Sequence, residues 1–372
     1  MHKYIHIVCL DAPSPPTYGG AIDMFFKIKA LASSGLKINL HYFSYHPGRT
    51  VSELEQYCHG IYAYERKSFW QTLLTPLPYI VSSRINTDLI DRLNKDDHPV
   101  LLEGFHCAGI IDYLTGKKRK IIIRAHNDEA GYYRSLGQVE TKLWKKAYFL
   151  RESRLLDSYQ LGINKSLPVA VLCQADSEVL SQRYGFENIQ VVPLFIPWDK
   201  VKAECGFGTY CLYHGNLGVA ENEAAAEWLV TNVFSSITVP LVIAGRSIST
   251  KLLKCLSSYP HISVVHEPSQ ADLSALISKA HIHVLPSFNT TGVKVKLLHA
   301  LFNGRFCITN PAGASGLPQD SGLLVLEAAA DFQKQINALM EVPYTEHDRQ
   351  LRHPLLSLHH NASNAIKLSA LL

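Results

Sequence analysis

The chain has 372 residues, of which 47% are hydrophobic and 18% are charged. These values are typical of a globular protein large enough for two domains, and they exclude a disordered or fibrous chain. The formal net charge of +4, with 18 histidines counted as neutral, is too small to indicate a nucleic-acid-binding protein. It suits a small anionic ligand or a membrane surface.

The cysteines and the N-terminal residues predict a cytoplasmic protein. Eight cysteines are scattered without a CxxC pair and mostly lie in apolar runs, which indicates reduced, buried thiols and no metal site. The apolar run Ile5–Leu10 is shorter than a signal peptide needs, and no run approaches the ~18 apolar residues of a membrane span.

The first elements along the chain form a βαβ unit. Ile5–Leu10 reads as a buried strand, a helix follows from about Ala21, and Leu36–Phe43 alternates as the next strand. The loop between strand and helix ends in Gly19 and Gly20. These glycines either let the backbone approach a ligand closely or simply form a tight turn before the helix.

The segment Tyr62–Arg84 mixes basic and aromatic residues around Pro76 and Pro78. One interpretation is an interfacial element, which would give peripheral contact with the inner membrane surface and a membrane-associated protein. The other is an ordinary core helix with a charged rim.

Two further strands end in polar side chains. Val100–Glu103 leads to His106, and Ile121–Arg124 leads to His126, Asn127 and Glu129. Carboxyl ends of parallel strands are where open α/β sheets bind ligands. His126 could therefore hydrogen-bond a substrate hydroxyl, and Glu103, His106 and Glu129 could orient a hydroxyl or accept its proton; a structural role is the alternative for each.

After a long helical region, Tyr132 to about Tyr159, a linker at 193–208 separates two series of alternating strands and helices. We expect two tandem domains, each a parallel sheet with helices on both faces. The first should span residues 1–200 and the second 201–345. Residues 346–372 should form a terminal helix that packs back on the N-terminal domain.

The stretch from Ala280 to Gly304 reads as strand, polar loop and helix, with Lys294 and Lys296 in the first helical turn. Cations there oppose the helix dipole at a cost of up to ~1 kcal/mol each. A phosphate held by the free N–H groups and both ammonium groups would remove that cost. The alternative is two solvated lysines on an exposed turn.

Several motifs together resemble the GT-B glycosyltransferases, and most closely the retaining, nucleotide-sugar-dependent family four. They are the glycine pair after the first strand, Gly215-Asn216, Ile243-Ala-Gly-Arg246, the Gly292-Val-Lys-Val-Lys296 loop and Gly313–Leu317. The resemblance implies two Rossmann-like domains facing each other across a cleft. It implies transfer of a hexose from a UDP- or GDP-linked sugar, with retention, to a saccharide or lipid-linked saccharide acceptor. No metal or other cofactor is expected.

The resemblance and the positions of the residues together predict roles for individual residues. The expected catalytic residues are His126, which would contact the donor sugar, with Lys294 and Glu103. The expected substrate-binding residues are Gly19, Gly20, Asn127, Glu129, Asn216, Arg246, Thr291, Gly292, Val293, Lys296 and His299.

Two departures from the family pattern keep other functions open. Thr291 and His299 stand where the family usually has glutamates, and Asn216 and Asn222 replace its diphosphate-binding Arg/Lys pair. Lys294, Lys296 and Arg246 could replace that pair. The alternatives are a non-catalytic relative that binds a nucleotide sugar or a partner, and a sugar-nucleotide epimerase. A Rossmann dehydrogenase is disfavoured because no GxGxxG follows a strand.

Overall fold

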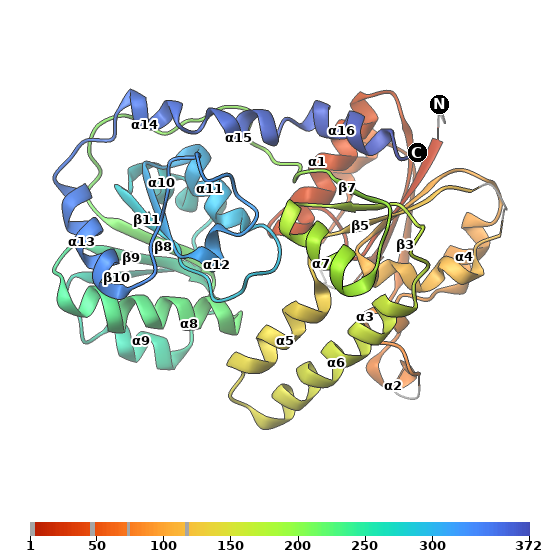
Figure 1. Cartoon of the computed structure of the whole chain (residues 1–372), viewed down its shortest axis with the longest axis horizontal. Coiled ribbons are helices and arrows are strands. Elements are labelled where there is room, and N and C mark those ends of the chain that lie inside the picture. Colours follow the sequence, from red (N-terminus) through yellow and green to blue (C-terminus); the bar gives the residue numbers. More distant parts are fainter. Residues whose placement is uncertain (1–3, 45–48, 73–74, 116–118) are drawn as a thin grey trace. The chain divides into compact units, whose positions relative to one another are not determined.

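The computed structural model describes residues 4–44, 49–72, 75–115 and 119–372. The described chain forms two compact units (Figure 1). The first unit comprises the chain up to Gly137, Trp144–Pro197 and His359–Leu372. The second comprises Trp198–Leu358 together with Gln138–Leu143. Each unit contains its own parallel sheet, as the sequence predicts.

The sheet of the first unit has seven parallel strands in the order β3-β2-β1-β4-β5-β6-β7. Their bounds are β1 Tyr4–Cys9, β2 Lys37–Ser44, β3 Cys58–Glu65, β4 Val100–Glu103, β5 Ile121–Ala125, β6 Val169–Val171 and β7 Ile189–Val191. Strand β1 pairs with β2 on one side and β4 on the other. The chain therefore reverses its direction of growth between β1 and β4, which is the place where open sheets bind ligands.

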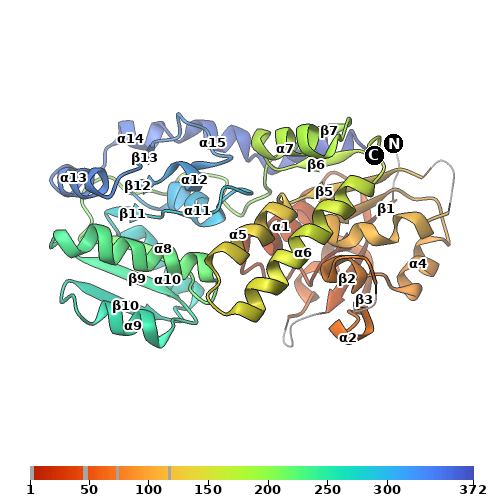
Figure 2. The ribbon, with the colours of Figure 1, turned by 60° about the horizontal axis from the view of Figure 1, so that its bottom comes forward.

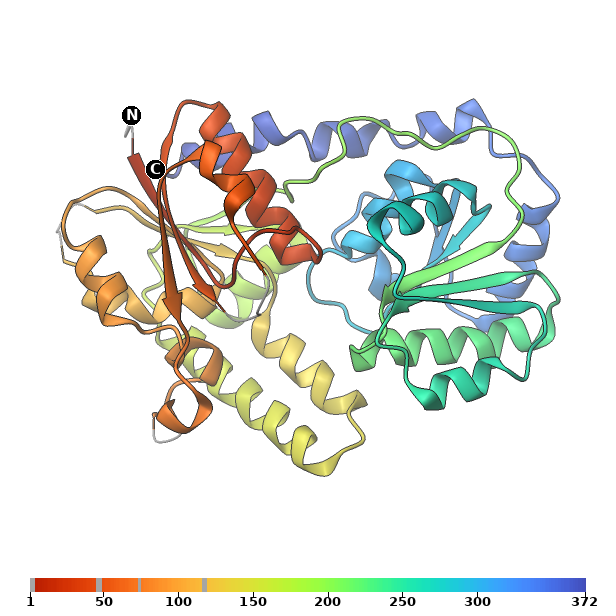
Figure 3. The same ribbon diagram turned by 180° about the vertical axis from the view of Figure 1, so that it is seen from behind.

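Helices cover both faces of this sheet (Figures 1 and 3). Their bounds are α1 Gly19–Ser33, α2 Phe69–Thr72, α3 Tyr79–Ser82, α4 Thr87–Leu93, α5 Glu129–Val139, α6 Leu143–Gly162, α7 Gln174–Tyr184 and α16 Asn361–Ser369; 3-10 segments span Ser52–Tyr57 and Phe105–Tyr113. The strand residues alternate between two cores, with Ile7 packing in the cluster of α1 and α16 and Val8 in the cluster of α4 and α7. The buried strands thus have the period of two that a sheet requires.

The second unit has a six-stranded parallel sheet in the order β10-β9-β8-β11-β12-β13. Its strands are β8 Cys211–Asn216, β9 Leu241–Arg246, β10 Ile262–His266, β11 Ile282–Val284, β12 Phe306–Thr309 and β13 Leu323–Val325. Its helices are α8 Ala220–Trp228, α9 Thr250–Leu256, α10 Gln270–Lys279, α11 Val295–Asn303, α12 Pro311–Ala314, α13 Ala329–Met340, α14 Glu346–Gln350 and α15 His353–Leu358; a π-helical turn, Leu229–Val233, extends α8. Strand β8 lies between β9 and β11, so the switch point of this unit is at their carboxyl ends.

Gly304 ends α11 for a packing reason. Its φ of −114° is open to any residue, but a Cβ atom there would fall on the buried imidazole ring of His283, on strand β11. The predicted helix stop is therefore confirmed, and its cause is the close approach of helix and strand.

Four expected elements differ in the structure. The Tyr62–Arg84 segment contains the end of β3 and the short helices α2 and α3, so no single core helix forms there. Pro78 is the N-cap of α3, and proline cannot continue a helix through its interior. Residues 73–74 of this segment lie outside the described residues.

The expected long helix at 132–159 is two helices, α5 and α6, which run side by side (Figures 1 and 2). A Cβ atom at Gly137 on α5 would lie 2.9 Å from a methyl carbon of Leu150 on α6, so the glycine permits their close approach.

Helix α1 begins at Gly19, which places Gly19 and Gly20 in its first turn rather than in the loop.

The terminal segment 346–372 forms three short helices, α14 to α16, in place of one. Pro354 lies in the first turn of α15, where a missing N–H costs nothing. Only α16 belongs to the first unit, where it packs beside α1 (Figures 1 and 3). Across the described ranges, no helix is both long and apolar enough to cross a membrane.

Candidate functional site

In the first unit, the carboxyl ends of three neighbouring strands bring the predicted residues together. Glu103 is the last residue of β4, and His126 follows β5 directly. The Nε2 atom of His126 lies 2.8 Å from Oε2 of Glu103. Because β1, β4 and β5 are adjacent, the loop after β1 and the start of α1 meet the same pair.

A network of four fully buried charged side chains supports this pair. The Lys27 ammonium lies 2.8 Å from Oε2 of Glu103 and 2.8 Å from Oδ2 of Asp23, and the Arg124 guanidinium lies 3.1 Å from Oδ1 of Asp23. Two carboxylates and two cations balance each other. Each buried charge is therefore paired, as stability requires.

The cations keep both carboxylates ionised. Burial raises the pKa of Asp23, but the charges of Arg124 and Lys27 outweigh it and lower the pKa below its usual value. Burial likewise raises the pKa of Glu103, and the Lys27 charge and the His126 hydrogen bond lower it further than burial raises it. Glu103 thus acts as an anion held in place. Glu103 is wholly buried, and Lys27 and His126 engage its carboxylate, so its expected role toward an acceptor stays a prediction.

Among the described residues, Asp23, Glu103 and His126 form the one group of three potential metal donors, with ligand atoms within 4.8 Å of one another. The Lys27 ammonium lies between the two carboxylates at hydrogen-bond distance from each. It occupies the place where a cation would bind. The donor set therefore reads as an ion-pair network, and the absence of a metal stays a prediction.

The first turn of α1 lies beside the His126 ring. A Cβ atom at Gly20 would lie 3.8 Å from Nδ1 of His126 and 3.1 Å from the Tyr18 ring. With Nε2 bonded to Glu103, the Nδ1 side of the imidazole is directed toward Gly20 in the first turn of α1. His126 is 8% exposed, so a small part of its ring is accessible.

Glu129, the first residue of α5, has an unusual environment. Burial, followed by the Asp128 charge, raises its pKa to about 8, although Arg84 and a hydrogen bond from Asn127 act in the opposite direction. One carboxylate oxygen lies 3.9 Å from Nδ1 of His106, whose pKa burial lowers well below its usual value. Glu129 can exchange a proton near neutral pH, which is the property of a general acid or base.

In the second unit, Asn216 and Arg246 are paired neighbours at the carboxyl ends of β8 and β9. Both side chains are exposed. Gly245 must be glycine, because a Cβ atom there would lie 2.3 Å from the backbone oxygen of Gly215. No described carboxylate lies within ion-pair distance of Arg246.

The loop between β11 and α11 is held by its own hydrogen bonds. The Thr291 N–H and hydroxyl both donate to Oδ1 of Asn289, and the Lys294 ammonium donates to the carbonyl oxygens of Thr291, at 2.6 Å, and Gly292. Gly292 has a φ of +65°, which favours glycine. Val293 is partly buried between Gly292 and Lys294. Helix α11 begins at Val295, with Lys294 as its N-cap, so Lys294 lies just before the first helical turn in which the sequence placed it.

Lys296, in the first turn of α11, reaches across to β8 and α8. Its ammonium donates to Oδ1 of Asn222 at 2.9 Å, lies 3.4 Å from the Tyr213 hydroxyl and stands over the Tyr213 ring. Burial lowers its pKa to about 8; the Glu221 charge opposes this shift and the Lys294 charge adds to it. The alternative of two solvated lysines is wrong, since each ammonium is fixed at the helix N-terminus.

His299 is engaged in packing. Its ring stacks on Trp198 with centroids 4.8 Å apart, and the edge of His214 lies against it. Burial lowers the pKa of His299 to about 4, so the ring is neutral at pH 7. The expected contact of His299 with the ribose of the donor stays a prediction.

The sequence did not single out Asp23, Lys27, Tyr213 or Trp198. Asp23 and Lys27 did carry a signal, because two charges at i and i+4 lie on the apolar stripe of α1, where unpaired charges are not expected. Trp198 and Tyr213 carried none, since both act through tertiary contacts.

The second unit matches a known protein family. Residues 208–342 match the model of the family described as glycosyl transferases group 1. A Klebsiella pneumoniae protein, described as an uncharacterized 44.6 kDa protein in the cps region, is 26% identical over 365 residues, covering 91% of this chain and 93% of the relative.

Solved structures resemble the whole chain. The sucrose-phosphate synthase of Thermosynechococcus elongatus superposes with a TM-score of 0.69 at 14% identity, covering 100% of this chain and 95% of that one. Anabaena HepE in complex with UDP-glucose gives 0.67 at 11% identity, with both chains covered completely. A variant of S. aureus TarM, in complex with fondaparinux, α-GlcNAc-glycerol and UDP, gives 0.67 at 11% identity, with 100% and 99% covered. This chain therefore has the GT-B fold of these structures, and its residues 208–342 match the glycosyl transferases group 1 family.

Proposed function

We propose that this protein transfers a hexose from a nucleotide sugar to a saccharide acceptor. The observation that carries the proposal is the pair of ammonium groups, Lys294 and Lys296, at the N-terminus of α11. They lie at the carboxyl edge of the sheet, inside the domain that matches the glycosyl transferases group 1 model. Cations at a helix N-terminus are unfavourable unless an anion joins them.

The anion would be the diphosphate of the donor. As the glycosidic bond breaks, negative charge grows on the leaving nucleoside diphosphate, and fixed donors that stabilise this charge are the largest catalytic contribution an enzyme can make. Lys296, the free N–H groups of α11 and the exposed Arg246 guanidinium are such donors. UDP is the first nucleotide to test, because the HepE and TarM structures contain it; GDP is the second.

In the first unit, His126 would hydrogen-bond a sugar hydroxyl through Nδ1. Glu103 and Lys27 are positioning residues for it, since they fix its Nε2 side. Glu129 would exchange the proton of the acceptor hydroxyl, because its pKa of about 8 suits that task. Retention of the anomeric configuration and independence from metal ions are part of this proposal.

We propose that the acceptor belongs to a surface polysaccharide and is lipid-linked, with the protein on the membrane surface. The relative from a cps region supports the first part. Two exposed tryptophans support the second: Trp70 on α2 is 80% exposed and Trp144 on α6 is 70% exposed, with the exposed Lys67 preceding α2. Tryptophan and lysine together are typical of elements that lie at a membrane interface.

The test is a transfer assay with purified protein, UDP- and GDP-hexoses and short lipid-linked saccharides, followed by mass spectrometry and NMR. An elongated saccharide with an equal amount of released nucleoside diphosphate supports the proposal, and the anomeric coupling reports retention. Donor binding without transfer to any acceptor would indicate the non-catalytic relative. A changed sugar nucleotide formed without acceptor would indicate an epimerase.

A further inference from the structure

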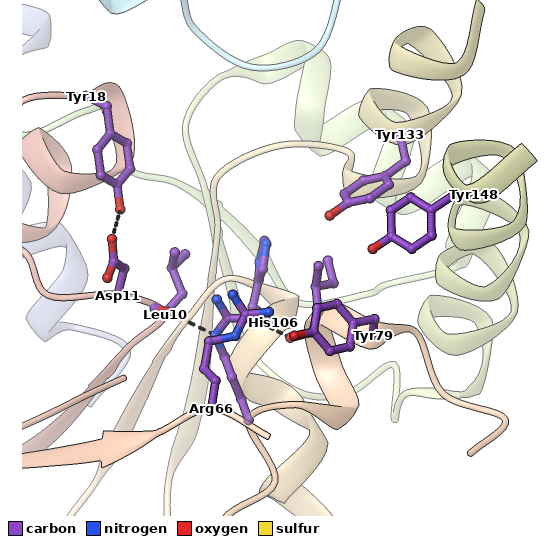
Figure 4. Close-up of a pocket in the computed structure, with 10 residues that line it drawn as sticks. Leu10, Asp11, Tyr18, Arg66, Tyr79, His106, Tyr133 and Tyr148 are labelled. Carbon is purple, nitrogen blue, oxygen red and sulfur yellow. Dashed lines mark hydrogen bonds between the residues drawn. The ribbon is translucent and has the colours of Figure 1, made fainter. Parts of the chain in front are cut away.

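A pocket of about 430 Å³ lies wholly within the first unit, between the loop after β1 and helices α3, α5 and α6. Figure 4 shows its walls, with Tyr18 and Asp11 on one side and Tyr79, Tyr133 and Tyr148 on the other. Arg66, Arg84 and His106 complete the charged and polar lining. None of the roles proposed above uses the two arginines.

Arg84 is a buried cation that has no counter-ion among the described residues. It is 4% exposed, and its Nε and Nη1 atoms donate to the backbone oxygens of Leu10, at 2.9 Å, and Ile80, at 2.6 Å. No described carboxylate lies within ion-pair distance of it. Burial, followed by the Arg66 charge, lowers its pKa only to about 10, so it stays protonated at neutral pH. A buried charge that only neutral groups contact is costly and calls for a partner.

The neighbouring acids do not supply that partner. Oδ2 of Asp11 accepts a hydrogen bond from Tyr18 at 3.3 Å and lies 3.5 Å from the Arg49 guanidinium, so its charge is compensated elsewhere. Glu129, with its pKa near 8, is mostly protonated at neutral pH. His106 is neutral, and its buried Nδ1 has no hydrogen-bond partner within the described chain. The pocket therefore has a net positive charge.

The aromatic wall suits a sugar. Arg66 stands over the Tyr79 ring, 5.1 Å from its centroid, and donates to the Ser83 hydroxyl. In Figure 4 the hydroxyl groups of Tyr133 and Tyr148 point away from their helices, toward the side of the pocket where His106 lies. Burial raises the pKa of Tyr133 well above its usual value, so this hydroxyl remains a donor. Rings can pack on a sugar face while their hydroxyls bind its oxygen atoms.

The pocket adjoins the proposed site of transfer. Tyr18, which lines it, and His126 both flank Gly20, and a Cβ atom on that glycine would lie within 4 Å of each. A saccharide whose charged end meets Arg84 would thus extend past Tyr18 toward His126.

We propose that this pocket is the acceptor subsite and that it selects a saccharide carrying a negative charge, a phosphate or a carboxylate, which Arg84 binds. This inference rests on the proposed function, because it names the class of acceptor. A phosphate would come from a lipid-linked or glycosyl phosphate, and a carboxylate from a uronic acid. Guanidinium groups bind both ions through charge-assisted hydrogen bonds.

The experiment measures binding of glucose 1-phosphate, glucuronic acid and methyl glucoside by ligand-detected NMR titration, with UDP as an independent probe of the second unit. We expect at least one anionic sugar to bind the wild type about ten times more tightly than methyl glucoside. The anionic sugar that binds more tightly shows whether the pocket prefers a phosphate or a carboxylate. The preference should weaken as salt is raised.

Three variants locate the preference. Arg84→Met and Arg66→Gln should each remove most of it, and Lys67→Gln, which deletes a charge just outside the pocket, should keep it. Circular dichroism verifies folding, and Arg66→Gln still tests the pocket if Arg84→Met does not fold. Equal binding of all three sugars to the wild type, or an anion preference that survives both arginine variants, overturns the inference. Failure of UDP to bind the wild type would instead overturn the donor assignment. Sugar binding by the two arginine variants would still test the pocket.

Discussion

The buried ion-pair network beneath His126 gives the sharpest test of the first unit. Replacement of Lys27 by methionine removes the cation that contacts both Asp23 and Glu103 at 2.8 Å. Asp23 retains Arg124, but Glu103 loses the one cation bonded to it among the described residues. Breaking a buried pair by removal of one partner costs about 3–5 kcal/mol.

That loss is large enough to measure by thermal unfolding. In a unit of this size, each kcal/mol moves the melting temperature by about 2–4 °C, so the first unit should melt roughly 6–20 °C lower. Lys29→Met is the matched control, because Lys29 lies two residues away on the exposed side of α1 and its replacement should change stability by no more than ~0.5 kcal/mol.

The stability difference between the wild type and Lys27→Met should also depend on pH. In the wild type the lowered pKa values of Asp23 and Glu103 contribute stability that is present above the unfolded value of about 4 and is lost as pH falls through the folded values. In Lys27→Met, burial raises the pKa of the unpaired Glu103, which takes up a proton more readily. The stability gap between wild type and variant should therefore narrow from pH 7 to pH 4.

A double variant separates pairing from packing. Lys27→Met with Glu103→Gln removes both members, and it should be less destabilised than the two single variants added together, by ~0.5–3 kcal/mol. The reasoning is refuted if Lys27→Met is no less stable than Lys29→Met, or if the two single effects simply add.

Three other consequences can be measured directly. Lys296→Met should weaken UDP binding about tenfold or more in calorimetry, whereas Lys251→Gln, which changes an exposed lysine of the same domain, should not. In the wild type, UDP binding should weaken as pH rises past the Lys296 pKa of about 8, because the ammonium loses its charge. Gly245→Ala should destabilise the second unit by several kcal/mol in denaturant titrations, since the new methyl group would overlap a backbone oxygen. Gly162→Ala should be neutral or slightly stabilising, because no described atom would lie within 4 Å of its methyl group. Trp70→Ser should reduce co-sedimentation with anionic lipid vesicles without changing UDP affinity, and unchanged co-sedimentation would contradict the membrane proposal.

The sequence predicted most of the fold because its strands are short apolar runs that alternate with helical patterns. This alternation requires parallel sheets, and parallel sheets place loop residues such as His126 and Arg246 at one edge. The same reasoning brought Lys296 to a helix N-terminus, where the structure has it.

The features that the sequence did not predict depend on contacts between residues far apart in the sequence. Lys27 meets Glu103 across 76 positions, and nothing local distinguishes that glutamate from an exposed candidate base. His299 stacks on Trp198, which belongs to the segment read as a linker. Element boundaries near prolines and glycines, as in Tyr62–Arg84, also escaped the pattern, because packing decides where such short helices begin and end.

The most direct test of the central claim, that the second unit binds a nucleotide sugar at α11, is thermal unfolding against UDP-, GDP-, dTDP- and CMP-sugars with Lys296→Met in parallel. A ligand at 100 times its dissociation constant adds ~2.7 kcal/mol, which corresponds to a rise of roughly 5–11 °C. We expect this rise for one nucleotide series in the wild type and a much smaller rise in the variant. No rise with any nucleotide, or an equal rise in both proteins, would contradict it.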